Sequence, residues 1–556
     1  MQTKELVQTF YLTIKSFSTK ERYLILILSF ILIFSTTKSL FNYVKADIWS
    51  NDDKSIYVEG MVGNLGVLNP LFSQPSSVDR DITALIYQGL SKYDPLTQQV
   101  VDNKSIATHS LSQNQKEYTF YLNKNATWQD GKPLTADDII FTYRDVIQNA
   151  NFPNVILKKT FDQITIEKID EFTVVFKLPL KNSFFFTSTL IGLLPKHIWE
   201  GTNVENIATS DLNKNPIGNG PYRFDSSTQS GNLTKINLTR FDNYQGDRAN
   251  ILNFSFVIAP TIDDLKQNIE KIHGLARLSK FDKAELVNNR FALYKYDLPR
   301  YTALFINNDK PYLKNQKIRL AIQKAIDKQA LVNEIGYEQV IDTPLLELQE
   351  DKWMFKSNKE EAMGALYDAG WKLNKDTNVR ENRNGDKLTL RLLTRTYEDV
   401  KQQEINTKSV NFIKTALGNV GIDVSIESYP FSFLQYVILD RDYDLLLYGQ
   451  SLEYNLDLYP YLHSSQAKDR GLNFSNYRNV KVDQLLDDLR NTFDHDTKTE
   501  KLKAIGDELE KDIPAVYLYT PYYYYLVDEK FSIGEIGELA THTDRFANIT
   551  NWTKEK

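Results

Sequence analysis

Residues 128–141 read WQDGKPLTADDIIF and predict a tight turn followed by a capped helix. Asp130 and Gly131 favour the turn, because glycine adopts a positive φ without steric cost. Thr135 can cap the helix, with Asp138 three residues later in a near version of the capping box. Apolar residues then follow at helical spacing: Ile139, Ile140, Tyr143 and Val146. No side chain in this stretch suggests catalysis, so it is informative about fold rather than about chemistry.

The overall composition describes a large globular protein without nucleic-acid character. The chain has 556 residues, which predicts two or three domains. Its 66 basic and 72 acidic residues give a net charge of -6, which argues against a nucleic-acid partner. The absence of cysteine excludes disulfides, cysteine-based metal sites and a lipid anchor on an N-terminal cysteine. The six histidines are scattered without metal-ligand spacing, so we expect neither a metal nor a cofactor.

The N-terminal region predicts export. Residues 23–34 read YLILILSFILIF, and basic residues precede them. We expect a cytoplasmic segment at 1–22, a signal peptide or membrane anchor (a transmembrane helix) at 23–44 and a linker at 45–54. An uncleaved anchor is favoured over cleavage, and a buried core helix is the alternative. The rest of the chain is then extracytoplasmic, in the periplasm or at the cell surface.

Strand and helix patterns alternate along the chain and predict an α/β fold, with the first half richer in strands. A strand is expected at 118–122, just before the opening motif. One long helix is expected over 315–335, since its apolar residues recur at helical spacing. Further strands are predicted at 388–393 and 443–448.

Six further segments appear in a fixed order and resemble one family. They are Ile86-Tyr-Gln-Gly-Leu-Ser-Lys-Tyr-Asp-Pro95, Gly218-Asn-Gly-Pro-Tyr222, Leu304-Phe-Ile-Asn-Asn308 with Arg319 to Asp327, Ala362 to Trp371, Val482 to Leu486, and Ile513 to Leu518. Together with the opening motif, they resemble the bacterial extracellular solute-binding proteins of family 5. These are the dipeptide- and oligopeptide-binding proteins of ABC transporters. The glycines at 218 and 220 do not suggest a dinucleotide site, because proline and a strand follow them.

The resemblance implies a bilobed periplasmic-binding-protein-like fold of type II, in the large three-domain form with a β-rich insert. It places lobe I at 55–86, 216–299 and 516–552, the insert at 87–215 and lobe II at 300–515. The hinge is expected near 299–307 and 514–520. The resemblance also implies that the protein is a monomer. It implies a substrate-binding protein for peptide transport and not an enzyme. It closes on its ligand and delivers the ligand to an ABC transporter permease.

Arg395 and Tyr397 are the residues expected to hold a ligand carboxylate. They follow the predicted strand 388–393, at the end where α/β clefts bind ligands. The planar fork of arginine donates two parallel hydrogen bonds to a carboxylate. The pair resembles the Arg-x-Tyr of dipeptide-binding members of the family. A solvent-exposed loop arginine is the alternative.

The loop 449–457 is expected to hold the ligand amine. Asp457 is the preferred acid and Glu453 the second choice, with Tyr454 in the same loop. The usual Asp-Pro of the family is absent here. A solvated loop acid is the alternative for both residues.

Two other functions are alternatives to peptide binding. The same fold can bind another solute, such as a nickel chelate or an oligosaccharide, although the scattered histidines do not favour bare metal. A secreted hydrolase is the less favoured alternative. Asp137 and Asp138 are adjacent on a helix and point about 100° apart, so they do not suit a carboxylate pair that flanks one bond. No Gly-x-Ser-x-Gly motif is present.

Overall fold

A computed structural model describes Ser18 and residues 56–72, 78–286, 290–336, 339–346, 348, 350–397, 400–454, 457–467 and 471–555. Within these residues no helix is long and apolar enough to cross a membrane. The apolar run at 23–34, with the signal or anchor expected there, lies outside the described residues.

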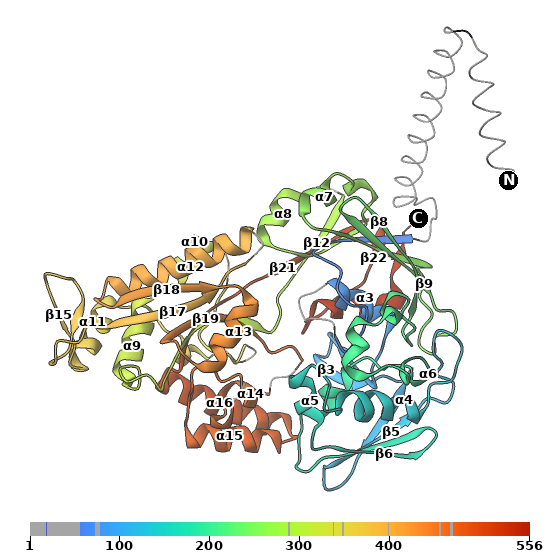
Figure 1. Ribbon diagram of the computed structural model, residues 1–556, viewed down its shortest axis with the longest axis horizontal. Coiled ribbons are helices and arrows are strands. Elements are labelled where there is room, and N and C mark those ends of the chain that lie inside the picture. The colour runs from blue at the N-terminus through green and yellow to red at the C-terminus, as the bar shows by residue number, and fades with distance from the viewer. Residues whose placement is uncertain are drawn as a thin grey trace.

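The described chain forms two lobes, each built on its own sheet (Figure 1). We call lobe I the part that contains the larger sheet. Its strands, in spatial order, are β12 (Phe291–Tyr296), β21 (Tyr523–Asp528), β11 (Gly274–Leu278), β1 (Ile56–Val62), β10 (Asn253–Ala259), β9 (Leu233–Arg240) and β8 (Tyr222–Ser230). Helical segments of this lobe are α3 (Val78–Ile86), α7 (Ile262–Lys266), η5 (Ile269–Lys271), α8 (Lys280–Leu286), η8 (His542–Phe546) and η9 (Ile549–Asn551), and a small β22 (Phe531–Ser532) and β23 (Thr553–Lys554) pair joins them.

Lobe II contains the second sheet. Its strands, in spatial order, are β14 (Gln339–Val340), β20 (Ala515–Thr520), β13 (Arg300–Ile306), β19 (Leu445–Ser451), β17 (Thr389–Arg395) and β18 (Asp423–Tyr429). Its helical segments are α9 (Gln316–Ala325), α10 (Lys328–Ile335), η6 (Asp351–Trp353), α11 (Lys359–Asp368), α12 (Val400–Gly418), α13 (Phe431–Asp440), α14 (Tyr459–Leu462), η7 (Ser464–Gln466), α15 (Val480–Arg490) and α16 (His495–Asp512), and β15 (Lys372–Leu373) pairs with β16 (Arg380–Glu381).

The insert carries the opening motif. It has a four-stranded antiparallel sheet of β4 (Ala107–Leu111), β5 (Glu117–Leu122), β7 (Thr173–Lys177) and β6 (Thr165–Asp170), with β2 (Ser91–Asp94) and β3 (Gln99–Asp102) as a separate hairpin. Its helical segments are α4 (Ala136–Ile140), the π-helix η1 (Phe141–Ile147), α5 (Val155–Phe161), η2 (Phe185–Leu190), α6 (Lys196–Trp199), η3 (Val204–Thr209) and η4 (Asp211–Lys214). In Figure 1 the insert lies below lobe I, on the same side of the molecule.

The opening motif folds as predicted. The strand β5 precedes it, Gly131 has a φ of 88°, and Thr135 caps α4 in a capping box with Asp138. Trp128 is fully buried in the core that the insert shares with lobe I. The motif therefore anchors the insert and contributes no side chain to the site described below.

Gln129 joins the motif to the Gly218-Asn-Gly-Pro-Tyr222 turn of lobe I. Its side-chain amide donates to the carbonyl of Tyr222 at 2.7 Å and accepts from the backbone N–H of Gly218 at 2.9 Å. Gly218 lies so close to α3 that an added Cβ would be 2.0 Å from the carbonyl oxygen of Ile86. The Gln129 side chain thus joins the motif to the turn, and glycine at position 218 lets the turn pack directly against the end of α3.

Replacing Gln129 by alanine is expected to lower the free energy of unfolding by about 1–3 kcal/mol, because half-buried backbone groups would lose their partners. Urea denaturation measures the change. Gln245→Ala, in an exposed loop, is the matched control and should stay within about 0.5 kcal/mol. A similar change in the free energy of unfolding for both variants would show that Gln129 does not hold the motif and the turn together.

Two expectations about elements are corrected. The single helix expected over 315–335 is two helices, α9 and α10. Ile326 has extended backbone angles (φ -96°, ψ 110°), and the Asp327 side chain accepts from the backbone N–H of Ala330 to cap α10. The strand β20 pairs with β13 and β14, so residues 516–520 belong to the sheet of lobe II rather than to lobe I.

Two short segments connect the lobes. One runs from β12 to β13 through residues 297–299, and the other from β20 to β21 through residues 521–522. Arg300 donates to the Tyr523 hydroxyl at 2.6 Å, which ties the two connections together. The ends of β13, β17, β19 and β20 that face lobe I therefore lie beside the crossing.

Candidate functional site

Arg395 lies at the last position of β17, at the edge of the lobe II sheet that faces lobe I. Its guanidinium carbon is 4.3 Å from the ring centre of Tyr397 and 4.9 Å from that of Phe431. The Nε atom is buried, and no described residue accepts a hydrogen bond from it. The guanidinium thus lies against two rings, and no hydrogen bond or ion pair within the described residues uses its donors.

Helix α12 fixes the backbone on which Arg395 and Tyr397 stand. The Asn406 side chain donates to the carbonyl of Arg395 at 2.9 Å, and Tyr397 donates its backbone N–H to the Gln403 side chain at 2.8 Å. Burial raises the pKa of the Tyr397 hydroxyl, against the opposing effect of Arg395. Tyr397 therefore stays a neutral hydrogen-bonding group beside a cation.

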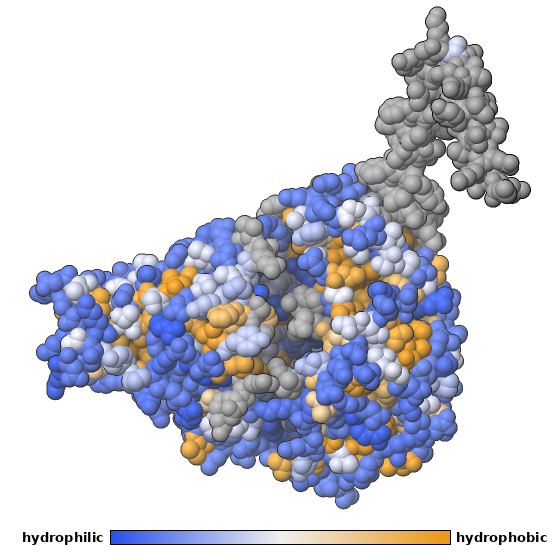
Figure 2. Space-filling model, viewed as in Figure 1, coloured by the Kyte–Doolittle hydropathy of each residue, from blue (hydrophilic) through white to orange (hydrophobic). Residues whose placement is uncertain are grey.

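Apolar residues of α13 extend this part of the surface. Phe431, Phe433, Tyr436 and Leu439 are all exposed. The space-filling view is hollowed between the lobes, and a hydrophobic patch lies on the lobe II side of the hollow, at the place of α13 (Figure 2). The unpaired cation therefore has an apolar border.

The loop after β19 reaches across to lobe I. Glu453 accepts two hydrogen bonds from Arg80 of α3, each 3.0 Å long, and the two side chains are 27% and 20% exposed. Tyr454 donates to Asp544 of η8 at 2.6 Å. Burial raises the pKa of the Asp544 carboxyl to about 6. These two residues of the loop thus join the lobes instead of lining an open surface.

Asp457 points in another direction. It is only 3% exposed and accepts from Arg490, at the end of α15, with N–O distances of 2.8 Å and 2.6 Å. Its second oxygen accepts from the backbone N–H of Tyr459 at 3.1 Å. The carboxylate is therefore already neutralised within lobe II.

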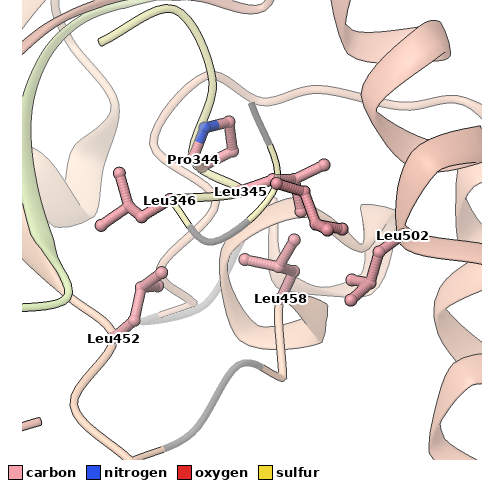
Figure 3. A pocket seen from close by; sticks show the side chains of 7 residues that line it. Pro344, Leu345, Leu346, Leu452, Leu458 and Leu502 are labelled. Atoms are coloured by element: carbon pink, nitrogen blue, oxygen red, sulfur yellow. The ribbon is translucent and has the colours of Figure 1, made fainter. Parts of the chain in front are cut away.

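An apolar pocket borders this loop at both ends. Its lining residues are Pro344, Leu345, Leu346, Leu348, Leu452, Leu458 and Leu502. Figure 3 shows the side chains of Leu345, Leu458 and Leu502 converging from three separate segments. The pocket adds aliphatic surface beside the loop but brings no charged group.

The residues predicted as a site form three groups. Arg395 and Tyr397 lie together, Glu453 and Tyr454 lie at the contact with lobe I, and Asp457 lies against α15. Within the described residues, no hydrogen bond or ion pair joins Arg395 to either acid. Sequence reasoning missed Arg80, Phe431 and Arg490. Arg80 is 373 residues away from Glu453, and no local pattern could have indicated that pair.

Metal ligation has no support in the described part of the chain, where no group of three or more His, Asp or Glu residues could hold a metal ion. The site therefore offers hydrogen bonds, one unpaired cation and aromatic surface. These groups can bind and orient a small anion.

Comparison with known structures gives the fold a class. The chain superposes on the solved structure of NikZ from Campylobacter jejuni in complex with Ni(L-His), with a TM-score of 0.72 and 22% identity, covering 90% of this chain and 100% of that one. It also superposes on the oligopeptide-binding protein AppA from Bacillus subtilis in complex with a nonapeptide, with a TM-score of 0.71 and 24% identity, covering 90% and 99%. The fold is that of the periplasmic binding proteins, in a mixed α/β form.

The sequence gives the family. The model of the bacterial extracellular solute-binding proteins, family 5 Middle, matches residues 103–471, more than half of the chain. The oligopeptide-binding protein AppA of Bacillus subtilis is 25% identical over 504 residues, covering 84% of this chain and 86% of that protein. The chain belongs to the family 5 solute-binding proteins of ABC transporters. It is therefore an extracytoplasmic binding protein rather than an enzyme, as the sequence predicted.

Proposed function

We propose that this protein captures peptides in the cleft between its lobes and delivers them to the permease of an ABC importer. The observation that carries the proposal is the Arg395 guanidinium, which lies against Tyr397 and Phe431 and has a buried Nε without an acceptor among the described residues. A partly buried cation without a counter-ion is unfavourable, and a ligand carboxylate removes that penalty. Every peptide with a free C-terminus carries such a group.

The roles of the other predicted residues follow from their positions. Tyr397 shares the carboxylate with Arg395, and Glu453 and Tyr454 form the wall that meets lobe I, while Asp457 is held by Arg490 within lobe II. Closure about the two connecting segments then brings this wall over the ligand. Recognition of a ligand amine by Glu453 or Asp457 requires that the acid first leave Arg80 or Arg490.

A nickel chelate is the second candidate ligand, because one superposed relative was solved with Ni(L-His). A chelating amino acid also carries a carboxylate that Arg395 can bind. The apolar border formed by α13 and the leucine pocket favours a peptide, since apolar side chains then find a dry surface.

Native mass spectrometry of the purified protein tests the proposal, since a tightly bound ligand is retained in the gas phase. We expect adducts whose masses correspond to peptides, recovered unchanged after release with acid. An adduct with a nickel isotope pattern would support the second candidate. A ligand without a carboxylate, or peptides recovered as cleavage products, would contradict the proposal.

A further inference from the structure

Both acids expected to bind a ligand amine already have an arginine of the chain as partner. Glu453 is held in a two-bond pair by Arg80 of lobe I, and Asp457 by Arg490 of lobe II. The first pair is half-buried at the lobe contact, and the second acid is almost fully buried. An ammonium group would have to compete with a guanidinium at each acid or displace it.

Such displacement is unfavourable at both sites. A guanidinium that donates two parallel bonds to one carboxylate holds it more firmly than an ammonium, which is a single point charge. The displaced arginine would also lose its counter-ion in a partly dehydrated place. The positions where a ligand cation is expected are thus filled by cations of the protein.

Arg395 shows the opposite situation. Its Nε is buried without an acceptor among the described residues, and its guanidinium carbon is 4.3 Å and 4.9 Å from the ring centres of Tyr397 and Phe431. Of the charged residues expected to hold the two ends of a ligand, the cation has an unused donor, while both acids are occupied. This charge balance fits a ligand with a negative end and no positive end.

We propose that the site takes carboxylates whose amine is blocked, that is, N-acylated peptides and N-acylated amino acids; this inference rests on the proposed function. Arg80 then occupies the place of the ligand ammonium at Glu453. The Arg80–Glu453 pair, which bridges the lobes, then forms without a ligand amine. A free amine brings no favourable contact and loses its hydration on entry.

A peptide library in three forms tests the class of ligand. The probes are one tetrapeptide library with free termini, the same library N-acetylated, and the same library C-amidated, each presented to the full chain and read by affinity-selection mass spectrometry. We expect the acetylated form to bind at least as tightly as the free form and the amidated form to bind about tenfold or more weakly, the scale of one charged hydrogen bond.

The outcomes separate this inference from the proposed function. A free form that binds about tenfold tighter than the acetylated form would overturn the inference and leave the carboxylate site intact. An amidated form as tight as the others, or no binding by any form, would overturn the proposed function and the inference with it.

Variants at the lobe contact test the role of Arg80. Arg80→Gln releases Glu453, so binding of the free form relative to the acetylated form should rise by about tenfold. Arg80→Lys keeps a cation and should leave the ratio near that of the parent protein, as should Arg144→Gln, an exposed control in the insert. An unchanged ratio in Arg80→Gln, with Glu453→Gln also unchanged, would show that Glu453 does not meet the ligand and would overturn the assignment.

Discussion

Replacing Arg545 by leucine is expected to lower the free energy of unfolding by about 3–5 kcal/mol, because the change leaves buried carboxylates without their cation. Arg545 is fully buried in lobe I, as are its partners Glu59 and Asp81. It forms an ion pair with Glu59 and donates to Asp81 at 2.7 Å. All three charged side chains are thus completely removed from water.

The network of buried ion pairs around Arg545 joins segments that are far apart in the chain. Glu59 is on β1, Asp81 on α3 and Arg545 on η8, and Arg277 of β11 donates two further bonds to Asp81. Burial acts to raise the pKa of Asp81, but Arg277 and Arg545 hold that pKa well below its usual value. Burial likewise raises the pKa of Glu59, and Arg545 opposes that rise. Without Arg545, Asp81 keeps Arg277, whereas the one partner left to Glu59 among the described residues is the Tyr525 hydroxyl.

Urea denaturation at neutral pH measures the loss. Arg144→Leu, on the exposed face of the insert, is the control and should change stability by less than about 0.5 kcal/mol. The double variant Arg545→Leu, Glu59→Leu should recover part of the loss, because it removes the unpaired acid together with its cation. A loss below about 1 kcal/mol for Arg545→Leu would show that the network is not a source of stability.

The second large effect is on binding. Arg395→Ala is expected to weaken peptide binding by about 1.5–3 kcal/mol, or roughly 10- to 150-fold, because a charged hydrogen-bond donor to the ligand carboxylate is removed. Calorimetry with a peptide recovered from the protein measures the change. Unchanged affinity would remove Arg395 from the site.

The same strand supplies a matched control. Arg391 is four residues earlier on β17, but it is paired with Glu427 and Asp442. Arg391→Ala should leave peptide affinity within about twofold, because this guanidinium is already paired with two carboxylates of the chain. A difference between the two variants therefore reports on the position of the cation and not on the loss of positive charge from the lobe.

Local sequence patterns predicted much of the fold. The turn and cap around Thr135 depend on a few neighbouring residues, and for that reason they could be recognised in advance. The position of Arg395 at a strand end could be predicted in the same way. The break at Ile326 was missed because apolar spacing continues across it, while the Asp327 cap that interrupts the helix gives only a weak local signal.

The partners of the acids could not be predicted from the sequence. The Glu453–Arg80 pair forms only when the two lobes meet, and the Asp457–Arg490 pair depends on how α15 packs against the loop. Both are long-range contacts between residues that are common on any surface. The sequence indicated acids near the site but contained no information on which cation each would meet.

We propose that Arg395 holds the carboxylate of the ligand. A four-way calorimetric comparison tests it most directly, with one recovered peptide and its C-terminal amide measured on the parent protein and on Arg395→Ala. We predict that amidation weakens binding to the parent protein by about tenfold or more and leaves binding to the variant nearly unchanged, since the variant has already lost the interaction. Equal losses on amidation in both proteins would place the carboxylate elsewhere and contradict the claim.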